Sequence, residues 1–206
     1  MSKSRRDHWD GVYAGKKPSE LTWFQEEPAA SLALIREAEI APDSRIIDVG
    51  GGVSPLPLFL LLDGYRDLSV LDISGEALAK AKSQLGARAE AVDWIEADVL
   101  DLEPERPWNL WHDRAVFHFL TSPSERESYL RVLDRGLDAG GHLIISTFAL
   151  DGPTRCSGLD CAQYSPDSLG SLLGSDYLLR GSIEEDHPTP RGGTQKFVYS
   201  WFERPR

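Results

Sequence analysis

Three carboxylates, each at or near the end of an apolar run, are the side chains of this sequence best placed to bind a ligand. Asp48 precedes a turn made of Gly50, Gly51 and Gly52. Glycine has no side chain, so a ligand can contact the backbone of such a turn. In nucleotide-binding α/β folds, an acid that binds the ribose follows the turn by roughly 20 residues, and Asp72 stands at this spacing. Asp98 follows the next apolar run, where a carboxylate can accept from an adenine amino group. These acids predict a site for an adenosine-containing cofactor.

The glycine turn favours a cofactor that has no diphosphate. Pro55 stands where the third glycine of a pyrophosphate-binding turn is expected. Proline lacks the backbone N–H and adds bulk at the helix start where a diphosphate would bind. S-adenosylmethionine carries no phosphate, so its binding tolerates this change. The sequence therefore predicts S-adenosylmethionine as the cofactor, and a nicotinamide dehydrogenase is the less favoured enzyme class.

Alternating strand and helix patterns predict the scaffold that holds these acids. Apolar runs indicate strands at 46–49, 68–71, 91–95, 110–116 and 142–148. Helical spacing or helix-capping residues indicate helices at 56–62, 74–81 and 124–137. This alternation is typical of a doubly wound parallel sheet, in which the three acids lie at the carboxyl edge.

The last part of the chain has a different pattern. Two extended runs, 177–183 and 196–202, are joined by a segment rich in proline and glycine, and they predict an antiparallel hairpin at the sheet edge. The expected fold is therefore α/β: a doubly wound, mostly parallel seven-stranded sheet with a C-terminal antiparallel hairpin in a three-layer α/β/α arrangement. Residues 27–206 are expected to form a single domain, preceded by a lid segment at residues 1–26.

Composition and charge narrow the class of partner. The chain has 206 residues, of which 41% are apolar, and this suffices for one sizeable core. A net charge of −11 disfavours nucleic acid as a partner, because it repels a phosphate backbone. The densest basic cluster, Lys3, Arg5 and Arg6, is interpreted as a solvated terminus and not as a binding patch. No apolar stretch is long enough to span a bilayer and no export signal is evident, which predicts no membrane partner and a cytoplasmic location. Two cysteines, Cys156 and Cys161, indicate neither a disulfide framework nor a metal site.

Together these motifs resemble those of the class I S-adenosylmethionine-dependent methyltransferases. The resemblance covers about residues 40–150 and the C-terminal hairpin, and it is carried by the segments 48–52, 71–74, 96–99 and 140–144. It implies that the glycine turn lines the methionine part of the cofactor, while Asp72 with Ile73 binds the ribose and Asp98 with Val99 binds the adenine. Ser54 stands where the family often has glycine, which is a mild departure.

A narrower resemblance concerns the segment 113–118, which is similar to the Asp-Arg/Lys-Gly motif of thiopurine-type and some lysine-targeting methyltransferases. It implies that Asp113 and Arg114 help to build the site, with Asp113 also near the cofactor. His118 is a candidate general base near neutral pH, and the alternative is a hydrogen-bonded structural histidine. His187 is interpreted as an exposed loop residue.

Aromatic residues in the lid segment are candidates for covering the cofactor. Their faces attract a sulfonium by roughly 0.5–2 kcal/mol, and the residues are Trp9, Tyr13, Trp23 and Phe24. The alternative, that these rings only pack the segment onto the sheet, is equally open. The motif at Trp9 and Tyr13, together with Trp23 and Phe24, is similar to small bacterial methyltransferases of unassigned substrate.

The function expected from these features is methyl transfer to a small-molecule nucleophile, such as a thiol or another soft nucleophile, with S-adenosylhomocysteine as the product. A protein-lysine methyltransferase is the first alternative, since an acidic surface suits a basic protein partner, although lysine-targeting relatives often have an acid where His118 stands. A non-catalytic protein that binds the cofactor and assists a partner is the further alternative.

Overall fold

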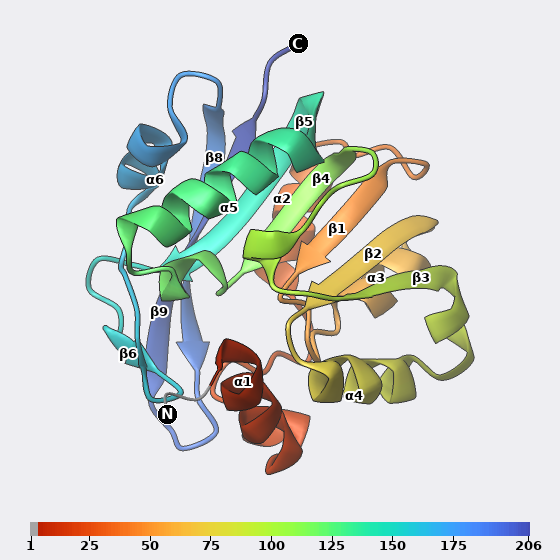
Figure 1. Ribbon diagram of the computed structural model, residues 1–206, viewed down its shortest axis with the longest axis vertical. Helices are drawn as coiled ribbons and strands as arrows, with labels where there is room; N and C mark the ends of the chain where they lie inside the picture. The colour runs from red at the N-terminus through yellow and green to blue at the C-terminus, as the bar shows by residue number, and fades with distance from the viewer. Residues whose placement is uncertain (1–3) are drawn as a thin grey trace.

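A seven-stranded sheet forms the centre of the computed structural model, which describes residues 4–206 (Figure 1). The strands lie in the order β3-β2-β1-β4-β5-β9-β8. They are β1 (Arg45–Val49), β2 (Asp67–Asp72), β3 (Val92–Glu96), β4 (Trp108–Arg114), β5 (Leu137–Phe148), β8 (Leu178–Pro188) and β9 (Thr194–Glu203). The first five are parallel, whereas β9 pairs antiparallel with both β5 and β8. The predicted sheet and its terminal hairpin are confirmed.

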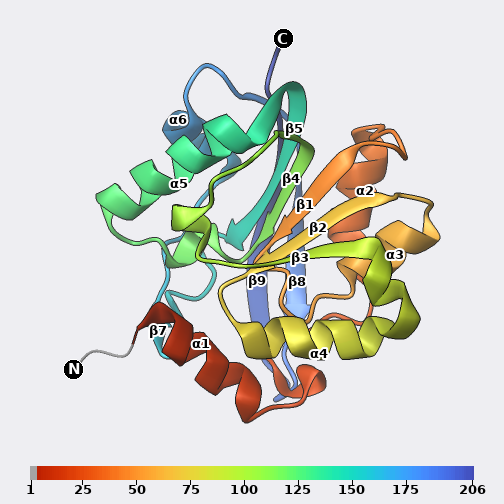
Figure 2. The same ribbon diagram turned by 45° about the vertical axis from the view of Figure 1, so that its right-hand side comes forward.

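Helices cover both faces of the sheet and complete the three layers (Figures 1 and 2). One face carries α2 (Ala29–Glu37), α3 (Leu56–Leu62) and α4 (Gly75–Leu85), and the other carries α5 (Pro123–Gly136) and α6 (Pro166–Leu173). Neighbouring strand residues alternate between the two apolar layers, as Ile46 packs with the α2 cluster and Ile47 with the α5 cluster. Because both faces are covered, the central strands appear in the sequence as nearly continuous apolar runs.

The boundaries of β5 depart most from the prediction. The sequence pattern predicts that this strand starts at residue 142, whereas it begins at Leu137. Gly140 has a φ of 79° and lies within the strand, where β4 and β5 are out of regular register between Trp108 and Leu110. Glycine permits this irregularity without breaking the strand pairing.

Short elements connect the main ones. They are the 3₁₀ turns η1 (Pro18–Glu20), η2 (Gly86–Ala91), η3 (Val99–Asp101) and η4 (Phe117–Phe119), and the small hairpin of β6 (Arg155–Cys156) and β7 (Leu159–Asp160). Two of them, η3 and η4, directly follow β3 and β4 at the carboxyl edge of the sheet, where a crevice for ligands is expected.

The lid segment, described from residue 4 onward, contributes α1 (Arg5–Ala14), which lies across the carboxyl ends of the parallel strands beside α4 (Figure 2). Lys3 and the first two residues lie outside the described residues. Ser4 is the N-cap of the helix, because its hydroxyl accepts a hydrogen bond from the backbone N–H of Asp7. Tyr13 and Leu21 are buried, so the segment packs on the sheet domain. Among residues 4–206, no helix has the length and apolar character needed to cross a membrane.

Candidate functional site

The glycine turn after β1 is held in a conformation that requires glycine at two positions. Gly50 has a φ of 66°, and a Cβ there would overlap the side chain of Val116. Gly52 has a φ of 43°, and a Cβ there would lie 2.7 Å from the Tyr13 hydroxyl and 3.0 Å from a carboxylate oxygen of Asp72. The turn is therefore shaped by contacts with α1, with the end of β2 and with the loop after β4.

Asp72, at the end of β2, is a buried carboxylate beside this turn. It is 5% exposed, and its Oδ1 accepts from the backbone N–H of Ser74 at 2.8 Å. Burial raises the pKa of Asp72 to about 7, and the nearby charge of Asp48 adds to the rise. A carboxylate with such a pKa gains from a ligand that donates hydrogen bonds to its ionised form.

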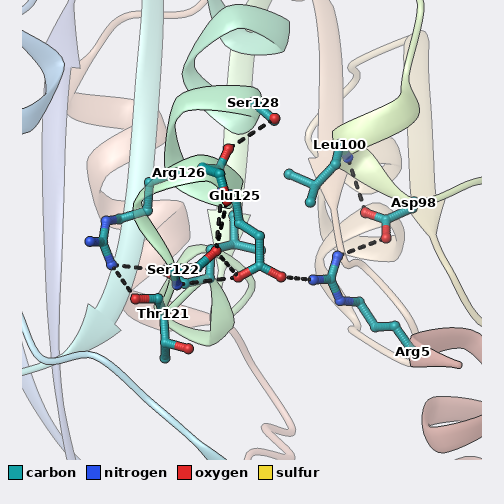
Figure 3. A network of polar contacts seen from close by, with 10 residues as sticks. Arg5, Asp98, Leu100, Thr121, Ser122, Glu125, Arg126 and Ser128 are labelled. Atoms are coloured by element: carbon teal, nitrogen blue, oxygen red, sulfur yellow. Dashed lines mark hydrogen bonds and ion pairs between the residues drawn. The ribbon is translucent and has the colours of Figure 1, made fainter. Parts of the chain in front are cut away.

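Asp98 follows β3 and is held by two partners (Figure 3). Its Oδ1 accepts from the backbone N–H of Leu100 at 3.0 Å, and its Oδ2 accepts from Arg5 of α1 at 2.7 Å. The other end of the Arg5 guanidinium pairs with Glu125 in the first turn of α5. Arg6 pairs with Glu96, so both arginines anchor α1 to the domain and are not merely solvated, which corrects the prediction from the sequence.

A cavity that opens to solvent lies between α1 and the carboxyl ends of the strands, and its empty space, including the solvent at its mouth, is about 840 Å³. The predicted site residues that line it are Trp9, Tyr13, Trp23, Gly50, Asp72, Ile73, Asp98, Val99, Arg114 and His118. A smaller cavity of about 420 Å³ adjoins the glycine turn, and its predicted site residues are Tyr13, Trp23, Asp48, Gly50, Gly51 and Arg114. Gly52 and Asp113 line neither cavity.

Asp113 is turned away from both cavities, so the expectation that it contacts the ligand does not match its placement. It is fully buried, and its Oδ1 accepts from the backbone N–H groups of Val116 and Phe117 at 2.9 and 3.4 Å. Its Oδ2 accepts from the Tyr129 hydroxyl at 2.6 Å, and burial raises the pKa of Asp113 to about 6. Side chains alternate along β4, so that Asp113 faces α5 and fixes the loop that follows, while Arg114 faces the opposite side.

The Arg114 guanidinium makes two hydrogen bonds and one contact with an aromatic ring, and one of its nitrogens makes no hydrogen bond within the described residues. Its Nε donates to the Tyr199 hydroxyl at 2.7 Å and its Nη1 to the Trp23 carbonyl at 2.9 Å. The guanidinium also lies 4.9 Å from the centre of the Phe197 ring. The remaining Nη2 is buried and has no hydrogen-bond partner among residues 4–206. Its nearest acidic neighbour is Oε2 of Glu185 at 3.9 Å, an ion pair beyond hydrogen-bond distance. Where Arg114 lines both cavities, Nη2 can therefore still donate to a ligand.

Asp48 provides the matching free acceptor. Its Oδ1 is bound to Nδ1 of His112 at 2.7 Å, and Nε2 of that ring lies 2.9 Å from the Ser31 hydroxyl. Its Oδ2 is buried without a partner within the described part of the chain. Asp48 and Arg114 thus offer one carboxylate oxygen and one guanidinium N–H to the same small cavity, a pair complementary to an ammonium and a carboxylate.

His118 accepts one hydrogen bond and has a second ring nitrogen without a partner among residues 4–206. The imidazole is 1% exposed, and its Nδ1 accepts from the backbone N–H of Phe148 at 3.3 Å. The proton of the neutral ring is therefore on Nε2, which is buried and has no partner in the described residues. Burial, with the charge of Arg114, lowers the pKa of His118 to about 3. Because its lone pair is occupied, the geometry favours the hydrogen-bonded structural histidine over the general base, the two alternatives that the sequence left open.

The lid rings meet above the glycine turn. Trp9 and Tyr13 have centroids 6.3 Å apart, and Trp23 lies 6.0 Å from the first and 6.2 Å from the second. Trp9 also contacts Phe119 of η4 at 5.0 Å. The rings pack against one another and also line the larger cavity. The two alternatives for these residues, packing of the segment and covering of a ligand, are therefore compatible.

His187 and both cysteines are buried. His187 is 3% exposed, and its Nε2 donates to the Thr22 carbonyl at 3.0 Å, so the prediction of an exposed loop histidine is wrong. Cys156 and Cys161 are both buried, and burial raises the pKa of each thiol. Within residues 4–206, no group of three His, Cys, Asp or Glu side chains is arranged to hold a metal ion.

Comparison with known proteins gives one family and several similar folds. Residues 47–145 match the family model described as a methyltransferase domain. No curated protein matches the chain significantly. A structure concerned with converting a disulfide bond into a thioacetal group during echinomycin biosynthesis superposes with a TM-score of 0.78 at 19% identity, covering 98% of this chain and 93% of that one.

Two further solved structures are similar over nearly the whole chain. An S-adenosylmethionine-dependent methyltransferase from Anabaena variabilis has a TM-score of 0.75 at 15% identity, covering 98% of this chain and 96% of that one. A Burkholderia thailandensis 1,6-didemethyltoxoflavin-N1-methyltransferase, solved with its substrate and S-adenosylhomocysteine, has a TM-score of 0.71 at 19% identity, covering 100% and 93%. At these identities the likeness shows the fold.

Proposed function

Because this chain is a class I S-adenosylmethionine-dependent methyltransferase, we propose that it methylates a small molecule at a nucleophilic atom such as sulfur or nitrogen. The observation that carries this proposal is the larger cavity, which is lined by Trp9 and Tyr13 of α1. An acceptor that reacts there has to fit under the lid segment. The neighbours named for toxoflavin and echinomycin chemistry concern small molecules, which supports the same class here.

The residues present fit the cofactor at both of its ends. Asp48 and Arg114 each have a free buried polar atom, and these suit the ammonium and carboxylate of the methionine part. Asp72 and Asp98 line the larger cavity, and in this proposal Asp72 accepts from the ribose hydroxyl groups and Asp98 from the adenine amino group. When bound, this cofactor supplies an electrophilic methyl group on a positively charged sulfur.

The protein contributes mainly alignment and exclusion of water. Holding two reactants in line can supply up to about 7–11 kcal/mol in ideal cases. Trp9 and Trp23 shield the cavity, and their faces stabilise a sulfonium by roughly 0.5–2 kcal/mol. Asp72 and Asp98, the carboxylates that line the cavity, are assigned to the cofactor and are not available to remove a proton from the acceptor. The acceptor atom is therefore expected to have a free lone pair when it binds.

Turnover and binding together test this function. Calorimetry with S-adenosylhomocysteine measures cofactor affinity, and a panel of small thiols, heteroaromatic amines and lysine-rich proteins, incubated with S-adenosylmethionine, identifies the acceptor class. We expect transfer to small molecules and none to proteins. Transfer only to the proteins would favour the lysine alternative, for which the net charge of −11 is the argument. Cofactor binding without any turnover would favour the non-catalytic alternative.

Asp72→Ala is expected to weaken binding of S-adenosylhomocysteine at least about tenfold, since hydrogen bonds from the ribose to a charged group are lost. The matched control is Asp43→Ala, an exposed acid just before the opposite end of β1, which should bind like the parent. Calorimetry measures both affinities, and thermal unfolding checks that both variants fold. Equal affinity in Asp72→Ala and the parent would contradict the assigned orientation of the cofactor.

The affinity for S-adenosylhomocysteine is also expected to depend on pH. The pKa of Asp72 is about 7 in the ligand-free protein, and ribose hydroxyl groups donate best to the ionised form. Affinity should therefore rise about tenfold from pH 6 to pH 8, as the ionised fraction grows, and then level off. In the Asp72→Asn variant this rise should be lost. A parent affinity that stays constant over this range would show that Asp72 does not bind the ribose in its ionised form.

A further inference from the structure

An aromatic slot forms the part of the larger cavity that lies away from the predicted adenine end. Asp98 follows β3 at one edge of the sheet, whereas Phe148 and Phe197 lie on β5 and β9 toward the other edge. These two phenylalanines are paired across the strands with ring centroids 4.8 Å apart. The His118 ring stacks on Phe148 at 4.4 Å with an angle of 24° between the planes. Stacked rings of this kind favour a flat, conjugated ligand.

Two polar atoms in the slot have no partner among residues 4–206. Nε2 of His118 is one, and it carries the proton because Nδ1 is occupied. The other is Oε1 of Gln195, whose side chain is 9% exposed and which lines the same cavity. Gln195 precedes Phe197 by two residues on β9, so both side chains lie on one face of the strand. Buried polar atoms are nearly always paired in folded proteins, and here a ligand can supply the partners.

The other reactive group in the slot is an unsuitable acceptor of the methyl group. Cys156 lines the cavity, but burial raises the pKa of its thiol, so the nucleophilic thiolate is scarce at neutral pH. The acceptor is therefore expected to be a bound small molecule.

We propose that the slot binds the methyl acceptor and that this acceptor is a planar heteroaromatic ring system with a lactam edge, a carbonyl next to a ring N–H. His118 donates to the carbonyl oxygen, Gln195 accepts from the ring N–H, and Phe148 and Phe197 provide the apolar walls. The proposal rests on the proposed function, because it names the substrate class of the same site.

The transfer itself then needs no base from the protein. A second, unprotonated ring nitrogen holds an in-plane lone pair, which forms the new N–CH₃ bond as the C–S bond breaks and its electrons stay on sulfur. The positive charge passes from sulfur to the ring, and no proton moves in the step. This matches a slot whose histidine is a fixed donor and whose cavity has carboxylates only at the cofactor end.

The test uses the 206-residue protein saturated with S-adenosylhomocysteine and two probes with the same fused bicyclic framework. Quinazolin-4(3H)-one has the lactam edge, whereas quinoline lacks both the carbonyl and the N–H. We expect calorimetry to show at least about tenfold tighter binding of the quinazolinone. Equal binding of the two probes, or none of either, would overturn the proposal. If S-adenosylhomocysteine itself does not bind, the proposed function fails and the proposal fails with it.

The Gln195→Leu variant assigns the preference to this site. We expect it to bind the quinazolinone about tenfold more weakly and to bind quinoline and S-adenosylhomocysteine unchanged. The matched control is Gln84→Leu, on the exposed side of α4, which should behave like the parent. His118→Phe should also lose the preference for the lactam, although it leaves the Phe148 N–H without a partner and can weaken folding. Parent-like binding of the quinazolinone by Gln195→Leu would overturn the assignment.

Discussion

Removal of residues 1–26 is expected to reduce the affinity for S-adenosylhomocysteine by about 100-fold or more, while the sheet domain stays folded. The lid segment supplies three of the rings that line the larger cavity, Trp9, Tyr13 and Trp23. Its described part, residues 4–26, contributes no strand to the seven-stranded sheet, so the apolar layers on both faces are expected to remain largely intact without the segment. The cofactor would then lose its cover and much of its apolar contact.

The truncation is best compared with a variant that keeps the rings and loosens their anchor. Arg5→Ala removes the ion pairs of α1 with Asp98 and Glu125 and leaves Trp9 in place. Because partly exposed ion pairs contribute little, we expect a loss of affinity below about tenfold. Calorimetry measures the affinities and far-ultraviolet circular dichroism checks the fold. A truncated protein that is folded and binds S-adenosylhomocysteine like the parent would disprove the role of the lid.

The part of the site nearest the sheet could be predicted because its signals are local. Asp48, Asp72 and Asp98 each lie in or just after a strand that contains an apolar run, and parallel strands bring their carboxyl ends to one edge. The glycine turn needed no tertiary information for the same reason. The order of the strands comes from the structure, since the sequence pattern predicts only a doubly wound, mostly parallel sheet.

The acceptor side could not be predicted, because tertiary structure alone brings its residues together. Phe148 and Gln195 come from strands far apart in the sequence, and their shared slot depends on the antiparallel return of β9 beside β5. Arg5 is similar, since its partner Asp98 is 93 residues away. A terminal arginine with no local partner is indistinguishable in the sequence from a solvated one.

Asp113 shows a different limit of sequence reasoning. It sits in β4, which is buried on both faces, so the pattern of apolar residues does not tell which side chain faces the ligand. The motif that it shares with Arg114 was expected to place both residues at the site. The pleat of the strand places one at the cavity and the other under α5, where it binds Tyr129.

Substitution of Arg114 is expected to weaken binding of the amino acid end of the cofactor much more than binding of its nucleoside end. We expect Arg114→Leu to weaken binding of S-adenosylhomocysteine by about 50-fold or more, because a buried carboxylate of the ligand would lose its charged partner. Binding of 5′-methylthioadenosine, which has the nucleoside and no amino acid part, should change less than about threefold. The comparison uses calorimetry on the same protein preparation.

The paired ligands distinguish recognition from support of the fold. Arg114 also donates to Tyr199 and to the Trp23 carbonyl, so Arg114→Leu is expected to lower the unfolding temperature as well. If the arginine only held the lid segment in place, both ligands would bind more weakly by a similar factor, because Trp23 lines the cavity for either one. A selective loss of S-adenosylhomocysteine binding is the result expected if Nη2 faces the carboxylate, since 5′-methylthioadenosine has the same adenine and ribose but no carboxylate.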